Sequence, residues 1–272
     1  MTESASPDRH PDGQITVEAQ GPILRIGIDR REKYNGFTPR MLAALGDAYT
    51  RLDEDPDLWV GVLFAHGPHF TAGLDLPRFR EGMKEGAAAR ERTRTDRVDP
   101  VALGRACRKP IIAAVHGITY TLGIELMLGA ADLVVAADDC RFSQLEPKRG
   151  IMATGGATFR FVERGGWGNA MYHLLLLDEF GAAEAHRCGL VQEIVPAGTQ
   201  LERATELARK IASYAPLAIQ ATKASARLYA REGEDACIAA MGATQAKLAA
   251  SQDAEEGVRS FIERREPKFQ GR

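Results

Sequence analysis

An α/β fold with a helical C-terminal region is the fold class that this 272-residue sequence predicts, and three observations support it. Short apolar runs, typical of buried strands, alternate with helical segments through the first half of the chain. Helical patterns dominate from about residue 154 onward. Neither a long-period repeat nor an interdomain linker interrupts this order, so we expect one large domain with a helical extension.

The N-terminal part of the chain is predicted to open with a β-hairpin. Residues 24–29 alternate apolar and other side chains with a period of two, and Ile15 and Val17 begin a weaker run before them. Thr38 and Pro39 then have the residue types of a helix N-cap and a first helical position. We therefore expect two strands followed by a helix.

Three continuous apolar runs, at 60–65, 111–115 and 133–136, predict strands that are covered on both faces. The stretch 123–131 is predicted to be a buried helix, and a short strand is expected at 190–195 after a helix stop at Gly189. Further helices are expected at 154–175, 181–188, 199–214, 217–230, 234–250 and 253–264, with Thr199 and Glu202 as a capping box.

Residues 77–100 differ from the rest because they are arginine-rich and almost devoid of large apolar side chains. We expect a mobile, partly helical segment. Two interpretations stay open, a moving lid over a site and a solvated surface face.

Composition excludes several classes of function. The formal net charge of −2 gives no general basic field for nucleic acid or an anionic membrane, and no stretch of ~18 apolar residues predicts a membrane span. Residues 1–13 are polar and are read as a frayed tail without a signal peptide. The four cysteines lack paired or zinc-type spacing, which favours free thiols in a reducing compartment and a cytoplasmic protein.

Two glycine-bearing junctions between a strand and a helix, at 69–76 and 116–126, are candidate sites of chemistry. A helix N-terminus leaves backbone N–H groups without partners, and two that converge on one oxygen form an oxyanion hole. Removing one such donor typically costs ~3 kcal/mol of transition-state stabilisation. The alternative is that glycine merely serves the geometry of the turn.

Two glutamates are candidate acid/base groups. Glu125 lies in an apolar stretch at the start of a predicted helix, where a buried carboxylate tends to have a raised pKa. Glu146 follows a strand and, taken alone, has the pattern of a surface glutamate. No GxSxG, P-loop or HExxH motif occurs, and His66 and His69 lack a third ligand nearby, so we expect no metal site.

Five motifs together resemble the enoyl-CoA hydratase/isomerase (crotonase) superfamily. They are FTAGLDL at 70–76, AAVHGITYTLGIEL at 113–126, the acidic, aromatic and Gly-Gly stretch at 131–156, EAHRCGLV at 184–191, and the C-terminal pattern that runs from Glu256-Gly257 through Phe261, Arg265, Pro267 and Phe269 to Gly271. Their order and spacing cover nearly the whole chain from about residue 14.

The resemblance implies a spiral core of ββα repeats, with C-terminal helices used in assembly as a homotrimer or a dimer of trimers. We accordingly expect a tail at 1–13, a core with the active site at 14–200 and a helical oligomerisation region at 201–272. It further implies a thioester oxygen held by the N–H groups of Leu74 and Leu122. Glu125 and Glu146 fall on the two glutamate positions of the hydratases, where Glu146 is tied more directly to proton transfer and Glu125 holds the water.

The same resemblance implies an acyl-CoA thioester substrate and no separate cofactor, because coenzyme A is part of the substrate. Lys33 would lie near its phosphates or adenine, although a solvated lysine is an equal alternative, and the Ala72 backbone would contact the adenine. Asp75 has the residue type of a helix cap. The residues placed at the ligand are Lys33, Tyr34, Ala72, Asp75, Leu76, Tyr120 and Gly123.

The sequence departs from the family pattern at Leu122, which replaces a glycine, and at Tyr120, which is bulkier than usual. The Leu122 side chain must point away from the ligand or narrow the pocket. Hydration of a 2-enoyl-CoA is the activity that two glutamates favour. Double-bond isomerisation, thioester or carbon–carbon hydrolysis, and binding of coenzyme A without turnover stay open, because one scaffold supports several reactions.

Overall fold

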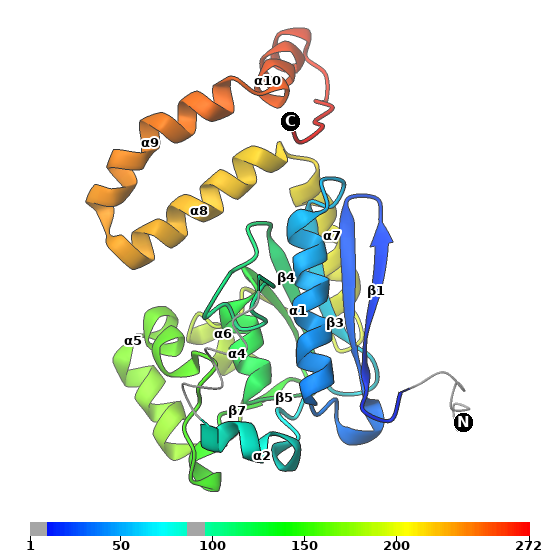
Figure 1. Ribbon diagram of the computed structural model, residues 1–272, viewed down its shortest axis with the longest axis vertical. Coiled ribbons are helices and arrows are strands. Elements are labelled where there is room, and N and C mark those ends of the chain that lie inside the picture. The colour runs from blue at the N-terminus through cyan, green and yellow to red at the C-terminus, as the bar shows by residue number, and fades with distance from the viewer. Residues whose placement is uncertain (1–9, 86–95) are drawn as a thin grey trace.

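The computed structural model describes residues 10–85 and 96–272, whose arrangement is shown in Figure 1. A six-stranded sheet has the order β1-β2-β3-β4-β6-β9, and a three-stranded sheet has the order β5-β7-β8. The strands are β1 (Gln14–Gln20), β2 (Ile23–Asp29), β3 (Val60–Ala65), β4 (Ile111–Val115), β5 (Ile118–Tyr120), β6 (Leu133–Ala137), β7 (Arg141–Ser143), β8 (Phe180–Gly181) and β9 (Glu193–Val195).

The α-helices are α1 (Pro39–Glu54), α2 (Leu76–Glu85), α4 (Leu122–Gly129), α5 (Ala157–Leu176), α6 (Ala182–Arg187), α7 (Gln200–Ala212), α8 (Pro216–Glu232), α9 (Glu234–Ala249) and α10 (Gln252–Glu263). Two short 3-10 helices are η1 (Arg31–Lys33) and η2 (Glu146–Arg149). The strand and helix order therefore confirms the α/β fold class with a helical C-terminal region.

The large sheet is packed on both faces because its central strands are apolar on both sides. Strand β4 is buried along its whole length. Its residues Ile112 and Ala114 lie in one apolar cluster with α7, whereas Ile111, Ala113 and Val115 lie in the cluster that includes α1. Fully burying an aliphatic side chain of this size contributes roughly 1.5–3 kcal/mol, so the two clusters fix the helices against the sheet.

The chain winds in repeated turns, each of which adds one strand to each sheet and then a helix. Strands β4 and β5 precede α4, and β6 and β7 precede α5; within each sheet the equivalent strands pair in parallel. The preceding turn, from β3 to α2, follows the same path, with Thr71 alone forming a parallel bridge to Thr119 of β5. The residues that follow Thr71, β5 and β7 therefore lie side by side.

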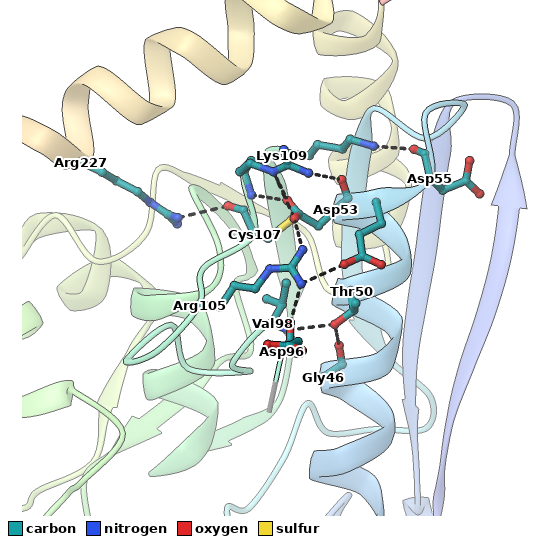
Figure 2. Close-up of polar contacts among 12 residues, drawn as sticks. Gly46, Thr50, Asp53, Asp55, Asp96, Val98, Arg105, Cys107, Lys109 and Arg227 are labelled. Atoms are coloured by element: carbon teal, nitrogen blue, oxygen red, sulfur yellow. Dashed lines mark hydrogen bonds and ion pairs between the residues drawn. The ribbon is translucent and has the colours of Figure 1, made fainter. Parts of the chain in front are cut away.

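The buried Asp53 of α1 binds the segment that precedes β4. Figure 2 shows the polar contacts around this residue. Asp53 accepts hydrogen bonds from the Arg108 backbone N–H and from Arg105 Nη2, each at 2.7 Å. Burial raises the pKa of Asp53, but the bonds from Arg108 and Arg105 outweigh it and lower the pKa below its usual value. Arg227 of α8 donates to the Cys107 carbonyl at 3.1 Å, so the same segment also contacts the helical extension (Figure 2).

Helices α8, α9 and α10 form an extension beyond the sheets (Figure 1). Helix α9 has no buried residue. The large apolar side chains that are exposed on this extension are Tyr229, Ile238, Met241, Val258, Phe261 and Ile262. The predicted helical extension is confirmed, whereas its role in assembly and the division of the chain at residues 200 and 201 stay predictions.

Most local predictions are confirmed, and two need correction. Thr38 caps α1, since its side chain accepts a hydrogen bond from the Met41 N–H at 3.3 Å. The capping box at Thr199 is wrong, because the Thr199 hydroxyl donates to the Pro196 carbonyl at 2.8 Å and makes no cap hydrogen bond. The strand predicted at 190–195 is shorter, since only its last three residues pair with β6.

The predicted tail and the arginine-rich segment are described only in part. Residues 1–9 and 86–95 lie outside the described residues. The helix α2 covers 76–85, so the partly helical character expected at 77–100 is confirmed there. The choice between a lid and a solvated face stays open.

All four cysteines are free thiols; Cys107, Cys140 and Cys188 are buried and Cys237 is partly buried. Burial raises the pKa of Cys107 to about 11, with a weaker contribution from nearby carboxylates. Among the helices of the described residues, none is both long and apolar enough to cross a membrane.

Candidate active site

Two backbone donors without partners lie in neighbouring turns of the chain. Thr71 and Thr119 are bridged through the Thr71 N–H to the Ile118 carbonyl and the Tyr120 N–H to the Thr71 carbonyl, each at 3.0 Å. Leu74 and Leu122 each lie three residues beyond a bridged threonine. Among the described residues, neither leucine N–H donates to a protein acceptor. The two junctions predicted from sequence thus each leave one backbone N–H without a protein acceptor, and their convergence on one oxygen stays a prediction.

Asn35 holds the first of these turns, and sequence reasoning missed it. Its side-chain Nδ2 donates to the carbonyls of His66 at 2.8 Å and His69 at 2.7 Å, and its carbonyl accepts from the Thr71 hydroxyl at 2.7 Å. Asn35 has φ 54°, a left-handed conformation that asparagine tolerates better than most residues. Its place within the short run after β2 was visible in the sequence, but the contacts with residues 30 positions away were not.

Asp75 lies beside a buried arginine. Its Oδ2 accepts a hydrogen bond from Arg30 Nη1 at 2.9 Å, and the same nitrogen donates to the Gly36 carbonyl at 2.8 Å. Arg30 is 5% exposed, so its charge depends on this carboxylate for compensation. The carboxylate expected to cap a helix therefore ties the loop after β2 to the start of α2, next to Leu74.

Glu125 is buried in the first turn of α4, a helix in which every residue is buried. Its Oε1 accepts a hydrogen bond from the Gly155 N–H at 2.5 Å. A methyl group on Gly155 would overlap the carboxylate, since an added Cβ would lie 2.5 Å from Glu125 Cδ. The absence of a side chain at Gly155 therefore allows this close approach.

Glu146 begins the short helix η2 directly after β7 and is only partly exposed. Its Oε2 is buried without a hydrogen-bond partner among the described residues. Burial and, to a smaller extent, the negative charge of Glu125 raise the pKa of Glu146 to about 7, against the opposing effect of its own backbone N–H. A carboxyl group that titrates near neutral pH is suited to exchange a proton with a ligand.

The departures at Tyr120 and Leu122 have separate outcomes. Leu122 is 5% exposed and belongs to the main apolar cluster, so its side chain packs into the core. The Tyr120 hydroxyl donates to the carboxylate of Glu179, which also accepts from Arg141 Nε at 2.8 Å. Both side chains thus have partners in the protein.

The strained residue of this turn is Thr121, with φ 49° and ψ −108°. Backbone strain of this kind costs of order 1–3 kcal/mol. The side chain of Thr121 lies against Gly73, where an added Cβ would overlap the threonine hydroxyl. The two turns can therefore pack closely only because residue 73 is a glycine. The same packing keeps Thr121 in its unfavourable backbone conformation.

The remaining residues predicted at a ligand lie around the first turn. Lys33 and Tyr34 are exposed, and the Tyr34 ring stacks on His69 with centroids 5.3 Å apart. The Ala72 N–H donates to the Tyr34 carbonyl at 2.9 Å, while Leu76 is partly exposed at the start of α2. Gly123 leaves little room for a side chain, since an added Cβ would lie 3.0 Å from the methyl group of Thr71.

One cluster of the described residues has the spacing of metal ligands, comprising His173, Glu184 and Cys188. A guanidinium group already takes the place of a cation there, since Arg187 Nη2 lies 2.6 Å from Glu184 Oε1 and 3.5 Å from Cys188 Sγ. The hydrogen bond from Arg187 lowers the pKa of Glu184 to about 2. The cluster is therefore an ion-paired network in which Arg187 supplies the positive charge.

Among the described residues, two backbone N–H groups without protein acceptors and two interacting carboxyl groups thus lie on three consecutive turns. The family model for enoyl-CoA hydratase/isomerase matches residues 18–272. The chain belongs to this enoyl-CoA hydratase/isomerase family, which confirms the resemblance and the crotonase-type fold.

Individual relatives span nearly the whole chain. The enoyl-CoA hydratase EchA19 of Mycobacterium tuberculosis is 33% identical over 261 residues, which are 94% of this chain and 96% of that protein. The 2,3-dehydroadipyl-CoA hydratase of Escherichia coli is 33% identical over 95% of this chain and 99% of its own length. A crystal structure from Mycobacterium abscessus, described as a probable enoyl-CoA hydratase/isomerase, is 43% identical with a TM-score of 0.91, over 97% of this chain and all of that one.

Proposed function

We propose that this protein is an enoyl-CoA hydratase that adds water across the double bond of a 2-enoyl-CoA. The observation that carries the proposal is the electrostatic interaction between Glu125 and Glu146. The charge of Glu125 raises the pKa of Glu146, so the two carboxyl groups interact within one poorly solvated site. Two carboxyl groups with different environments are suited to act as acid and base on neighbouring atoms.

In the proposed reaction the thioester oxygen accepts hydrogen bonds from the N–H groups of Leu74 and Leu122. These donors stabilise the enolate-like charge that develops when water adds to the β-carbon. Glu125, held by Gly155, orients the water and accepts its proton. Glu146, whose pKa of about 7 leaves it partly protonated, delivers a proton to the α-carbon.

Coenzyme A enters this proposal as part of the substrate, with no separate cofactor. The exposed Lys33 and the Tyr34 ring lie beside the turn that bears Leu74, which supports their contact with the phosphates and the adenine. The Ala72 backbone would contact the adenine. Asp75, Leu76, Tyr120 and Gly123 shape the same two turns and are placed at the edge of the acyl-CoA site.

Assembly as a homotrimer or a dimer of trimers is a further part of the proposal. It is supported by the exposed apolar side chains on α8, α9 and α10, of which Phe261 is 84% and Ile262 is 73% exposed. Large apolar side chains that gather on an exposed extension are typical of a protein–protein contact. Sedimentation of the purified protein would test it, and a monomer at micromolar concentration would contradict it.

The test of activity is incubation of the purified protein with a panel of acyl-CoA thioesters and analysis by mass spectrometry. Hydration would appear as a gain of one water, isomerisation as altered retention without a mass change, and hydrolysis as release of coenzyme A. If no 2-enoyl-CoA gains water, the proposal is wrong.

Isomerisation is the second candidate function, because a single carboxylate suffices for a proton shuttle between carbon atoms. Glu146, with its raised pKa and free Oε2, would be that carboxylate. The variant Glu125→Gln separates the two reactions, since it should abolish hydration but be tolerated in an isomerase.

A further inference from the structure

Gly155 makes polar contacts at both of its ends. Its N–H donates to Glu125 at 2.5 Å, and its carbonyl accepts a hydrogen bond from Arg160 Nη1 at 3.1 Å. Arg160 lies in the first turns of α5, five residues along the chain. The Gly155 backbone is therefore held at its carbonyl by Arg160, while its N–H holds the carboxylate of Glu125.

Arg160 is anchored to a second segment of the chain. Its Nη1 donates to the Val101 carbonyl at 2.6 Å and its Nη2 to the Ala102 carbonyl at 3.0 Å. A methyl group at Gly129 or at Gly156 would overlap this guanidinium group. The two glycines thus leave space for the guanidinium group, and three carbonyl groups hold it in one position.

The charge of Arg160 acts on the same glutamate. The hydrogen bonds to the carbonyls of Val101, Ala102 and Gly155 hold the guanidinium group without neutralising its positive charge. Burial lowers the pKa of Arg160, while the charges of Asp99, Glu125 and Glu163 oppose this effect. An arginine remains cationic in proteins, so the guanidinium group and the Glu125 carboxylate attract each other.

We infer that Arg160 is a positioning residue of the active site, which fixes the Gly155 peptide groups and keeps the Glu125 carboxylate aligned for the water. This inference rests on the proposed hydration reaction. Through Arg160, helix α5 would thus support the position of Glu125, in addition to the two glutamates that act on the substrate.

Arg164 provides a matched control. It lies one turn further along α5 and, like Arg160, its pKa is lowered by burial. Its Nη2 donates to the Leu128 carbonyl at 3.3 Å, and among the described residues it makes no hydrogen bond to Gly155. A role in packing α5 alone would make the two arginines equivalent, whereas the inference makes only Arg160 important for turnover.

The test compares Arg160→Gln, Arg160→Lys and Arg164→Gln in steady-state hydration of the best substrate of the unaltered enzyme. We expect Arg160→Gln to lower kcat by about 10- to 100-fold, as for loss of a charged hydrogen bond, with KM changed less than about threefold. Arg160→Lys, which keeps the charge, should regain about tenfold of that loss, and Arg164→Gln should stay within about threefold of the unaltered enzyme.

A full kcat in folded Arg160→Gln, or an equal loss in Arg164→Gln, overturns the inference. If Arg160→Gln does not fold, Gly129→Ala displaces the guanidinium group while keeping its charge, and unchanged kcat in that variant also overturns it. Crystal structures of the unaltered protein and a folded Arg160 variant separate this inference from the proposed function. If the unaltered protein hydrates no substrate, the proposed function is wrong. If the hydrogen bond between Gly155 and Glu125 is unchanged in the Arg160 variant, the inference is wrong, whatever the activity.

Discussion

Glu125 and Glu146 lie at the ends of consecutive turns, yet their surroundings differ in kind. Glu125 is buried on a regular helix and accepts a short hydrogen bond from Gly155. Glu146 starts a short 3-10 helix, and one of its oxygens has no partner among the described residues. The comparison teaches that the more tightly held carboxylate suits a fixed orienting role, whereas the loosely held one suits proton exchange.

Removal of the Glu146 carboxyl group should have the largest effect. We expect Glu146→Gln to lower kcat for hydration by about 10²- to 10⁴-fold, the range that general acid–base catalysis contributes. Glu163→Gln, which makes the same change at an exposed site on α5, is the control and should leave kcat unaltered within about twofold. Equal activity of Glu146→Gln and the unaltered enzyme would show that the loosely held carboxyl group does not transfer the proton.

The pH dependence should report the same group. Because the pKa of Glu146 is raised to about 7, the protonated form needed for hydration is lost as the pH rises through 7. We expect kcat/KM to fall about tenfold per pH unit well above this value, and the basic limb to be absent from the residual activity of Glu146→Gln. The raised pKa also means that this group destabilises the fold progressively between about pH 4.5 and 7, because the folded state then holds the proton more tightly.

A methyl group at Gly155 tests the tightly held glutamate. Gly155→Ala should displace the Glu125 carboxylate, and a misplacement of about 1 Å is expected to lower kcat by roughly 10²-fold. Gly168→Ala, in the same helix region but with open space around the added methyl, should be neutral. Measurement of kcat for both variants at one pH would check this. Equal activities would show that Glu125 need not be held tightly for turnover.

The smallest expected effect concerns the backbone before Glu125. Thr121→Gly relieves the strained conformation at φ 49° and should raise the free energy of unfolding by up to about 1 kcal/mol. Thr121→Ala removes the hydroxyl but keeps the strain, so it should not gain this stability. Urea denaturation of the three proteins would measure the difference, and an equal gain in both variants would locate the effect in the hydroxyl instead.

Sequence reasoning found the elements and the motif residues because those depend on local patterns. The apolar runs of β3, β4 and β6 and the junctions at Leu74 and Leu122 are visible within a few residues of chain. The capping box failed because Thr199 uses its hydroxyl for the preceding turn. Local patterns predict which segments fold regularly, but they do not show which competing hydrogen bond a side chain makes.

The supports of the site were missed for a different reason. Glu125 and Gly155 are 30 residues apart, and Arg30 and Asp75 are 45 apart, so no periodicity links them. The departure at Leu122 drew attention in the sequence, whereas the strain falls on the adjacent Thr121. Contacts of this range depend on how successive turns stack, which requires the three-dimensional structure.

The repeated turns have a consequence for how new activities can arise on this scaffold. The two donors proposed for the oxyanion hole belong to the first and second turns, whereas Glu146 belongs to the third. A substitution or insertion after β7 would thus exchange the reacting group while leaving thioester activation intact. Each turn behaves as a replaceable module, so reaction type can diverge one module at a time without rebuilding recognition of the substrate.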